Sequence, residues 1–237
     1  MESSMSICSS PVIVALDFDE LSVAKALVNK LTPYDCRLKV GKEMFTLFGP
    51  DWVKYLVDLG FEVFLDLKFH DIPNTVAKAV SAASKLGVWM TNVHASGGAD
   101  MILAAKEAAN SAINPPLLTA VTVLTSMDER QFSEVYNSKD ISGKVLTLAL
   151  MAQASGADGV VCSAREARIL RKEVNKEFCL VTPGIRPIGA SSDDQKRIMT
   201  PLEAINVGVY YLVIGRPITK AGDPKFVLQA INDSLRL

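Results

Sequence analysis

Short apolar runs alternate with stretches of helical periodicity along almost the whole chain. This alternation is typical of βα units that assemble into a parallel sheet. The predicted strands are residues 11–17, 36–40, 62–68, 89–95, 117–124, 159–162, 178–184 and 210–215. The predicted helices are residues 20–31, 52–59, 74–86, 99–111, 144–155, 164–174, 202–207 and 223–235. The pattern therefore predicts eight βα units.

Glycines mark several predicted returns from helix to strand. Gly60, Gly87 and Gly156 each follow a helical stretch, where a left-handed backbone favours glycine. Eight units within 237 residues match one (β/α)8 TIM barrel, although an open doubly wound sheet uses the same units. No GxGxxG sequence follows the first strand, which argues against a dinucleotide-binding sheet. We predict an α/β fold with a single (β/α)8 barrel over residues 11–237, preceded by a polar tail over residues 1–10.

The overall charge is nearly balanced, with 25 Lys and Arg against 26 Asp and Glu. Nucleic acid and membrane surfaces are therefore not expected as partners, whereas a small molecule is. The start of the chain lacks the basic residues of a signal peptide, and the apolar run at residues 12–16 is too short to span a membrane. The cysteines form no CxxC pair, which argues against a zinc site and a disulfide framework and favours a reducing cytoplasm.

Charged residues close the first three predicted strands, at the end where a (β/α)8 barrel collects its reactive groups. Asp17 ends the first strand, Lys39 the second, and Asp66 and Lys68 alternate on one face of the third. Each has an ordinary explanation: a turn residue, a lysine extending to solvent, and a structural ion pair. Because buried charges are costly unless paired, their concentration favours a site built from opposed charges.

The segment after the third strand carries further polar residues. Pro73 suits the first position of a helix, so Asp71 has a simple explanation as a helix-start carboxylate and Thr75 as a first-turn residue. His70 and His94 have no further ligand at metal-binding spacing. We predict that both are hydrogen-bonded structural histidines and that the chain has no metal site.

The last two units have the features of a phosphate site. Gly215 and Arg216 follow the eighth strand and offer backbone N–H groups and a guanidinium, in a region where TIM barrels often bind phosphate. The polar segment over residues 184–200 is long enough for a lid, and a solvated loop is the simpler alternative. Four of its side chains can reach an anion: Arg186, Gln195, Lys196 and Arg197.

Taken together, these segments resemble the orotidine 5′-phosphate decarboxylase family, in particular its bacterial-type branch. The resemblance covers the chain from Val12 onward and rests on LDFD, LKVGKEMFTLFGP, FLDLKFHDIPNTV, NVHASGG, VTVLTSM, TPGIRP, DDQKR and VIGRPIT, in family order. It implies conversion of orotidine 5′-monophosphate to UMP and carbon dioxide, the last step of UMP biosynthesis, without a cofactor or metal ion.

The resemblance also implies a catalytic network of alternating charge. Lys68 would deliver a proton to C6 of the pyrimidine, Asp66 would face the substrate carboxylate, and Lys39 would bridge the acids and the ribose. Asp71 completes this network and, with Thr75, would reach the pocket of the neighbouring subunit of a homodimer.

The implied substrate-binding residues surround the network. Asp17 would bind a ribose hydroxyl. Thr125 and Ser126 would contact the pyrimidine. Pro183 and Arg186 would lie at a mobile loop, the segment over residues 184–200. The phosphate would be held by Gln195, Gly215 and Arg216.

Two alternatives stay open at this point. A hexulose-phosphate-synthase-like lyase shares the barrel and an Asp-x-Lys strand end, but it would need a magnesium site, which the DLKFHDIPNT sequence supports less well. A non-catalytic nucleotide-binding barrel would need Gln195 and Arg216 but not Lys68. Turnover in the presence of a chelator separates all three.

Overall fold

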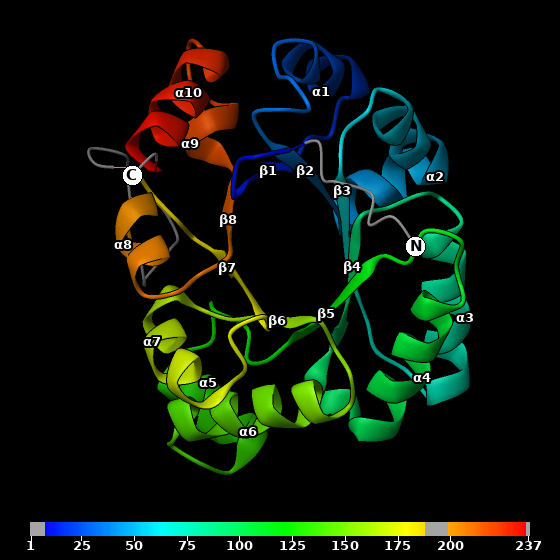
Figure 1. The fold of residues 1–237 in the computed structure, drawn as a ribbon, viewed down its shortest axis with the longest axis vertical. Coiled ribbons are helices and arrows are strands. Elements are labelled where there is room, and N and C mark those ends of the chain that lie inside the picture. The colour runs from blue at the N-terminus through cyan, green and yellow to red at the C-terminus, as the bar shows by residue number, and fades with distance from the viewer. Residues whose placement is uncertain (1–7, 188–198, 236–237) are drawn as a thin grey trace.

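Eight parallel strands form one closed barrel in the computed structural model of the chain, which describes residues 8–187 and 199–235. Each strand pairs with the next along the chain, and β8 pairs with β1 to close the ring. The helices surround the strands as an outer layer (Figure 1). This architecture confirms the predicted (β/α)8 barrel over the open doubly wound sheet.

The strands lie close to their predicted positions. They are β1 (Val12–Leu16), β2 (Arg37–Gly41), β3 (Val63–Phe69), β4 (Met90–His94), β5 (Leu117–Val121), β6 (Gly159–Val161), β7 (Cys179–Pro183) and β8 (Tyr211–Ile214). The helices are α1 (Leu21–Val28), α2 (Lys42–Asp58), α3 (Pro73–Ser84), the 3₁₀ turn η1 (Ala95–Gly97), α4 (Ala99–Asn110), α5 (Glu129–Tyr136), α6 (Ile141–Ala154), α7 (Ala164–Glu173), α8 (Pro201–Asn206), α9 (Arg216–Thr219) and α10 (Pro224–Leu235).

Helices α2 and α5 differ most from the sequence prediction, and the short helix α9 was not predicted either. Helix α5 was not predicted; Asp128 caps it by accepting a hydrogen bond from the Gln131 N–H at 3.0 Å. Helix α2 begins ten residues before its predicted start at residue 52, at Lys42, and contains a kink. Gly49 has a φ of 65° there and is followed by Pro50, which cannot donate a backbone hydrogen bond.

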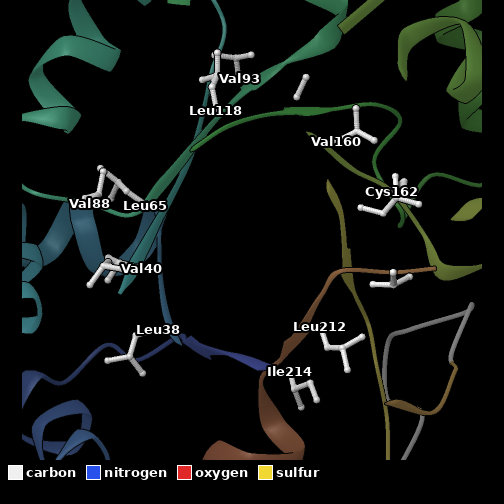
Figure 2. Packing of buried hydrophobic residues seen from close by; sticks show 14 of the residues in the cluster. Leu38, Val40, Leu65, Val88, Val93, Leu118, Val160, Cys162, Leu212 and Ile214 are labelled. Carbon is white, nitrogen blue, oxygen red and sulfur yellow. The ribbon is translucent and has the colours of Figure 1, made fainter. Parts of the chain in front are cut away.

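The outer face of the strands packs against the helices. Leu38, Val40, Leu65, Leu212 and Ile214 lie on the outer side of the ring of strands and are at most 1% exposed (Figure 2). Burial of this face removes a large apolar area from water, which is the main favourable term in folding. The outer layer therefore fixes the strands whose ends carry the polar residues.

A smaller apolar layer fills the inside of the barrel. Its members are Ile13, Ala15, Phe64, Met90, Val181 and Val213, and all are buried. Along each strand alternate residues share a face, so Asp66 follows Phe64 on the inner side of β3. The interior therefore changes from apolar to charged toward the carboxyl ends of the strands.

Arg37 occupies the opposite, amino-terminal end of the barrel interior. Its Nε lies 2.7 Å from a carboxylate oxygen of Glu62, and its guanidinium lies 4.4 Å from the ring centroid of Trp89 and 5.0 Å from that of Tyr211. The side chain of Arg37 is 5% exposed. A buried, paired guanidinium packed on two contacting aromatic rings thus closes this end.

The packed part of the chain begins within the predicted polar tail. Cys8 and Ser10 are buried, and the Ser10 carbonyl accepts a hydrogen bond from Arg37 at 2.6 Å. The Ser10 hydroxyl donates to Asn232 of α10 at 2.7 Å. Residues 8–10 are therefore attached to the barrel, because their carbonyl groups accept hydrogen bonds from a buried arginine.

None of the helices within residues 8–187 and 199–235 has the length and apolar content that a membrane span requires.

Candidate active site

The carboxyl end of β3 departs from regular strand geometry. The register with β4 shifts between Leu65 and Phe69, and Lys68 lies in this bulge with a φ of 55°. Few residues other than glycine adopt that conformation. It turns the Lys68 ammonium back to Asp66, with 2.6 Å between Nζ and Oδ1. The structure thus brings Asp66 and Lys68 together through a bulge rather than through the regular alternation that the sequence predicts.

Lys39 on β2 extends the cluster. Its Nζ lies 3.4 Å from Asp66 Oδ2 and 3.5 Å from Asp17 Oδ1. The Lys39 side chain is 11% exposed, whereas that of Asp17 is 62% exposed. A Cβ atom on Gly41 would lie 3.3 Å from Lys39 Nζ, so glycine leaves room for the ammonium. Asp17, Lys39, Asp66 and Lys68 therefore form a row of alternating charge that runs from solvent into the barrel.

Asp66 is the buried centre of this row. Burial alone would raise its pKa, but the charges of Lys39 and Lys68 and the hydrogen bonds from Lys68 and Asn92 together lower the pKa below its ordinary value of 3.8. The carboxylate is therefore ionised at neutral pH. A buried charge in this position is tolerated because two ammonium groups and an amide surround it.

Asn92 on β4 belongs to this cluster and was missed by the sequence analysis. Its side chain contacts both Asp66 and the backbone of Lys68. The available signal was its position between Met90 and His94, which alternation places on the inner face of β4. A buried amide there required a polar partner, and Asp66 supplies it.

A cavity of about 290 Å³ opens onto the cluster. Its apolar walls come mainly from the inner layer of the barrel, and its polar walls come from the carboxyl ends of the strands. The lining residues are Ala15, Asp17, Lys39, Phe64, Asp66, Lys68, Thr125, Val161, Pro183, Gly184, Arg186, Val213, Gly215 and Arg216. Mixed walls with a few convergent charged groups are typical of a site for a small polar ligand.

Two cationic residues that follow β7 and β8 line the cavity. Arg216 begins α9 directly after Gly215, and Arg186 is 6% exposed just beyond β7. A Cβ atom on Gly215 would lie 3.6 Å from Ala15 Cβ, which is an ordinary van der Waals distance. Gln195, Lys196 and Arg197 lie outside the described residues. The described part of the chain thus places positive charge where the sequence predicts a phosphate site.

Thr125 and Ser126 do not end a strand, because β5 stops at Val121. Both lie in the loop between β5 and α5. Thr125 lines the cavity, whereas Ser126 is exposed and does not. The structure therefore brings only one of this predicted pair to the cavity wall.

Asp71 and Thr75 are not part of the cavity of their own chain. Both are exposed, and neither lines the cavity. The Asp71 carboxylate accepts a hydrogen bond from the Ile72 N–H at 2.6 Å, at the start of α3. Ile72 itself is 66% exposed. These residues form a surface beside the cavity and take no part in the described cluster.

The two histidines lie next to each other near the carboxyl ends of β3 and β4. Their ring centroids are 5.5 Å apart. Burial, followed by the charges of His70, Lys42 and Lys68, lowers the pKa of His94 to about 4, so His94 is neutral at pH 7. In the part of the chain that the structure describes, no group of three or more His, Cys, Asp or Glu side chains is placed to hold a metal ion.

The fold and the cluster define the class of protein: a (β/α)8-barrel enzyme with its charged site at the carboxyl ends of the strands. The family model described as the orotidine 5′-phosphate decarboxylase / HUMPS family matches residues 10–231. The chain therefore belongs to this family.

Relatives with known names agree with the family match. The orotidine 5′-phosphate decarboxylase of Pseudoalteromonas atlantica is 60% identical over 94% of this chain and 97% of its own length. That of Pseudoalteromonas translucida is 58% identical over 96% of this chain and 97% of its own length. The crystal structure of the Lactobacillus acidophilus orotidine 5′-phosphate decarboxylase superposes with a TM-score of 0.86 at 42% identity, and it covers 96% of this chain and 99% of the other.

Proposed function

We propose that the charged cluster at the mouth of this barrel decarboxylates orotidine 5′-monophosphate and that Lys68 supplies the proton. The overall reaction follows from the family: the chain is a carboxy-lyase that forms UMP and carbon dioxide in pyrimidine biosynthesis. The roles of individual residues are our proposal. The observation that supports it best is Lys68, held 2.6 Å from a buried carboxylate in the cavity.

The substrate phosphate binds at the β7 and β8 side of the cavity. Arg216 and Arg186 supply positive charge there, and Gln195 of the following segment completes the site together with the backbone at Gly215. This anchor directs the ribose toward Asp17 and Lys39, and the pyrimidine toward the cluster and the β5 loop with Thr125 and Ser126. Pro183 lines the wall between the phosphate and the base.

Loss of carbon dioxide leaves an electron pair on C6 of the pyrimidine. Lys68 stabilises this charge, because its ammonium is already oriented by Asp66 when the substrate arrives. The proton then moves from Lys68 Nζ to C6, and the amine recovers a proton from solvent. Asp66 faces the departing carboxylate, so the repulsion between the two falls as neutral carbon dioxide leaves. No cofactor takes part.

Each site is completed by a second copy of the chain. Asp71 and Thr75 are exposed beside the cavity, and the exposed Ile72 between them gives the same surface an apolar residue suited to an interface. In a homodimer, Asp71 extends the alternating network of the neighbouring subunit and Thr75 binds its substrate.

The compartment and the domain organisation form part of the proposal. Cys36, Cys162 and Cys179 are buried free thiols, which suits a reducing cytoplasm. Burial raises the pKa of Cys162 to about 12, so this thiol is unreactive at neutral pH. Residues 11–237 act as a single catalytic domain, with no nucleic-acid or membrane partner.

A chelator assay tests the proposed reaction. The purified protein, dialysed against EDTA, should convert orotidine 5′-monophosphate to UMP at the same rate as the untreated protein. Activity that disappears with EDTA and returns with Mg²⁺ would instead support a hexulose-phosphate-synthase-like lyase. Binding of UMP without any turnover would support the non-catalytic barrel.

Mixing experiments test the shared site. Lys68→Ala and Asp71→Ala proteins should each be inactive, and a mixture should recover up to about a quarter of native activity, since only heterodimers carry one site with both residues intact. Absence of recovery after mass spectrometry has demonstrated subunit exchange would contradict the shared site.

A further inference from the structure

One amide joins the two reactive residues of β3. Asn92 lies on the inner face of β4, beside β3, and is fully buried. Its Nδ2 donates a hydrogen bond to Asp66 Oδ1 at 2.7 Å, and its Oδ1 accepts one from the Lys68 backbone N–H at 2.8 Å. The side chain therefore holds the carboxylate with one end and the main chain of the lysine with the other.

Regular hydrogen bonding between β3 and β4 is interrupted at Lys68, and the Asn92 side chain supplies a hydrogen bond there instead. Leu65 pairs with Thr91, and the next pair is Phe69 with Val93. Asn92 is thus the residue of β4 opposite the bulge, where regular pairing is lost. Its side-chain oxygen satisfies the N–H of Lys68 and stabilises a left-handed conformation that lysine rarely adopts.

The contact to Asp66 fixes the orientation of the carboxylate. Oδ1 accepts both the Asn92 amide at 2.7 Å and the Lys68 ammonium at 2.6 Å. With one oxygen held from the strand beside it, Asp66 cannot rotate freely about its terminal bond. The ammonium of Lys68 is then directed by a carboxylate that is itself held in place.

We propose that Asn92 is a positioning residue of the decarboxylase: it sets the geometry of Asp66 and Lys68 for proton delivery without touching the substrate. The inference rests on the proposed roles of Lys68 and Asp66. A neutral amide suits this position because it donates and accepts at once, whereas a carboxylate would accept only and would repel Asp66.

Steady-state kinetics of matched variants test the proposal. Asn92→Ala should lower kcat by roughly 10- to 100-fold, the size of effect expected from a small misplacement of catalytic groups, with KM for orotidine 5′-monophosphate and the inhibition constant of UMP within about threefold of native. Thr91→Val is the control: Thr91 is equally buried on the same strand, and its hydroxyl donates to the Leu65 carbonyl on the outer face. It should lose thermal stability with kcat within about twofold of native.

Asn92→Asp provides a readout that a purely structural role would not change. The introduced carboxyl group can donate to Asp66 only when it is protonated, and the nearby charge of Asp66 raises its pKa. The ratio of variant to native kcat should therefore rise as the pH is lowered from 8 to 5, while the ratio for Asn92→Ala stays flat. This near-isosteric variant also keeps the test available if Asn92→Ala folds poorly.

The outcomes are separable. If the native protein turns over its substrate but both Asn92 variants keep kcat within twofold of Thr91→Val, or lose only substrate affinity, the positioning role is wrong. A flat pH ratio for Asn92→Asp also contradicts it. If neither the native protein nor Thr91→Val turns over orotidine 5′-monophosphate, the proposed function fails and this inference fails with it.

Discussion

Replacement of Arg37 should destabilise the protein without changing its chemistry. The guanidinium is 2.7 Å from Glu62, donates to the Ser10 carbonyl, and packs on the contacting rings of Trp89 and Tyr211 at the amino-terminal end of the barrel. This end of a (β/α)8 barrel contributes to stability, whereas the carboxyl end carries the site. Arg37→Met retains much of the packed volume but removes every charged interaction.

The magnitude follows from what the substitution leaves behind. Removing one partner of a buried ion pair costs roughly 3–5 kcal/mol, because the other charge stays buried. The Glu62 side chain is 18% exposed, so its carboxylate stays partly hydrated. The lower half of the roughly 3–5 kcal/mol range therefore applies. Loss of the aromatic contacts adds about 1 kcal/mol. We expect a loss of about 4–5 kcal/mol in the free energy of unfolding.

Urea denaturation at pH 7, followed by circular dichroism, measures this loss, and kcat for orotidine 5′-monophosphate is measured in parallel. A second substitution, Glu62→Gln in the Arg37→Met background, should recover about 1–2 kcal/mol because it removes the stranded carboxylate. A loss below 1 kcal/mol, or a fall in kcat of more than threefold in protein that is still folded, would refute the reasoning.

Three further predictions concern the site. Lys68→Ala should lower kcat by at least about 10³-fold, measured by UMP formation with protein that calorimetry shows to be folded; near-native kcat would contradict proton delivery by Lys68. Arg216→Ala should weaken UMP binding by about tenfold or more in calorimetric titration but leave uridine binding unchanged; equal losses for both ligands would contradict a phosphate contact. Because the folded-state pKa of Asp66 is lowered, its ionised form stabilises the fold above the unfolded-state pKa, and this contribution is lost as the pH falls through the folded-state value. Urea midpoints between pH 7 and pH 3 should therefore fall more steeply for the native protein than for Asp66→Asn, and parallel curves would contradict the shift.

Local patterns were sufficient to predict the barrel and the charged residues of the cavity wall. The eight strands and the position of Asp17, Lys39, Asp66 and Lys68 at strand ends follow from hydrophobic alternation and from the polarity of a parallel barrel. These features depend on residues that are close together in sequence. They survive even where predicted boundaries differ by a few residues.

Features that depend on contacts between distant segments were not predictable. The bulge at Lys68 requires the register of β3 against β4, and the hydrogen bonds of Asn92 to Asp66 and Lys68 can be recognised only once that register is known. Arg37 was not recognised because its partners come from other strands and from residues 8–10. The exposure of Asp71 on its own chain likewise depends on where α3 begins in space.

The apolar layer inside the barrel forms the inner wall of the cavity and lowers the local dielectric constant there. Phe64 and Val213 belong to that layer and also line the cavity, directly beneath the charged row. These two uncharged side chains separate the charged row from the rest of the barrel interior, and a bound ligand that covers the cavity leaves the charges in a medium of low dielectric constant. The field acting on the ligand thus depends on Phe64 and Val213, which carry no charge, as well as on the ions above them.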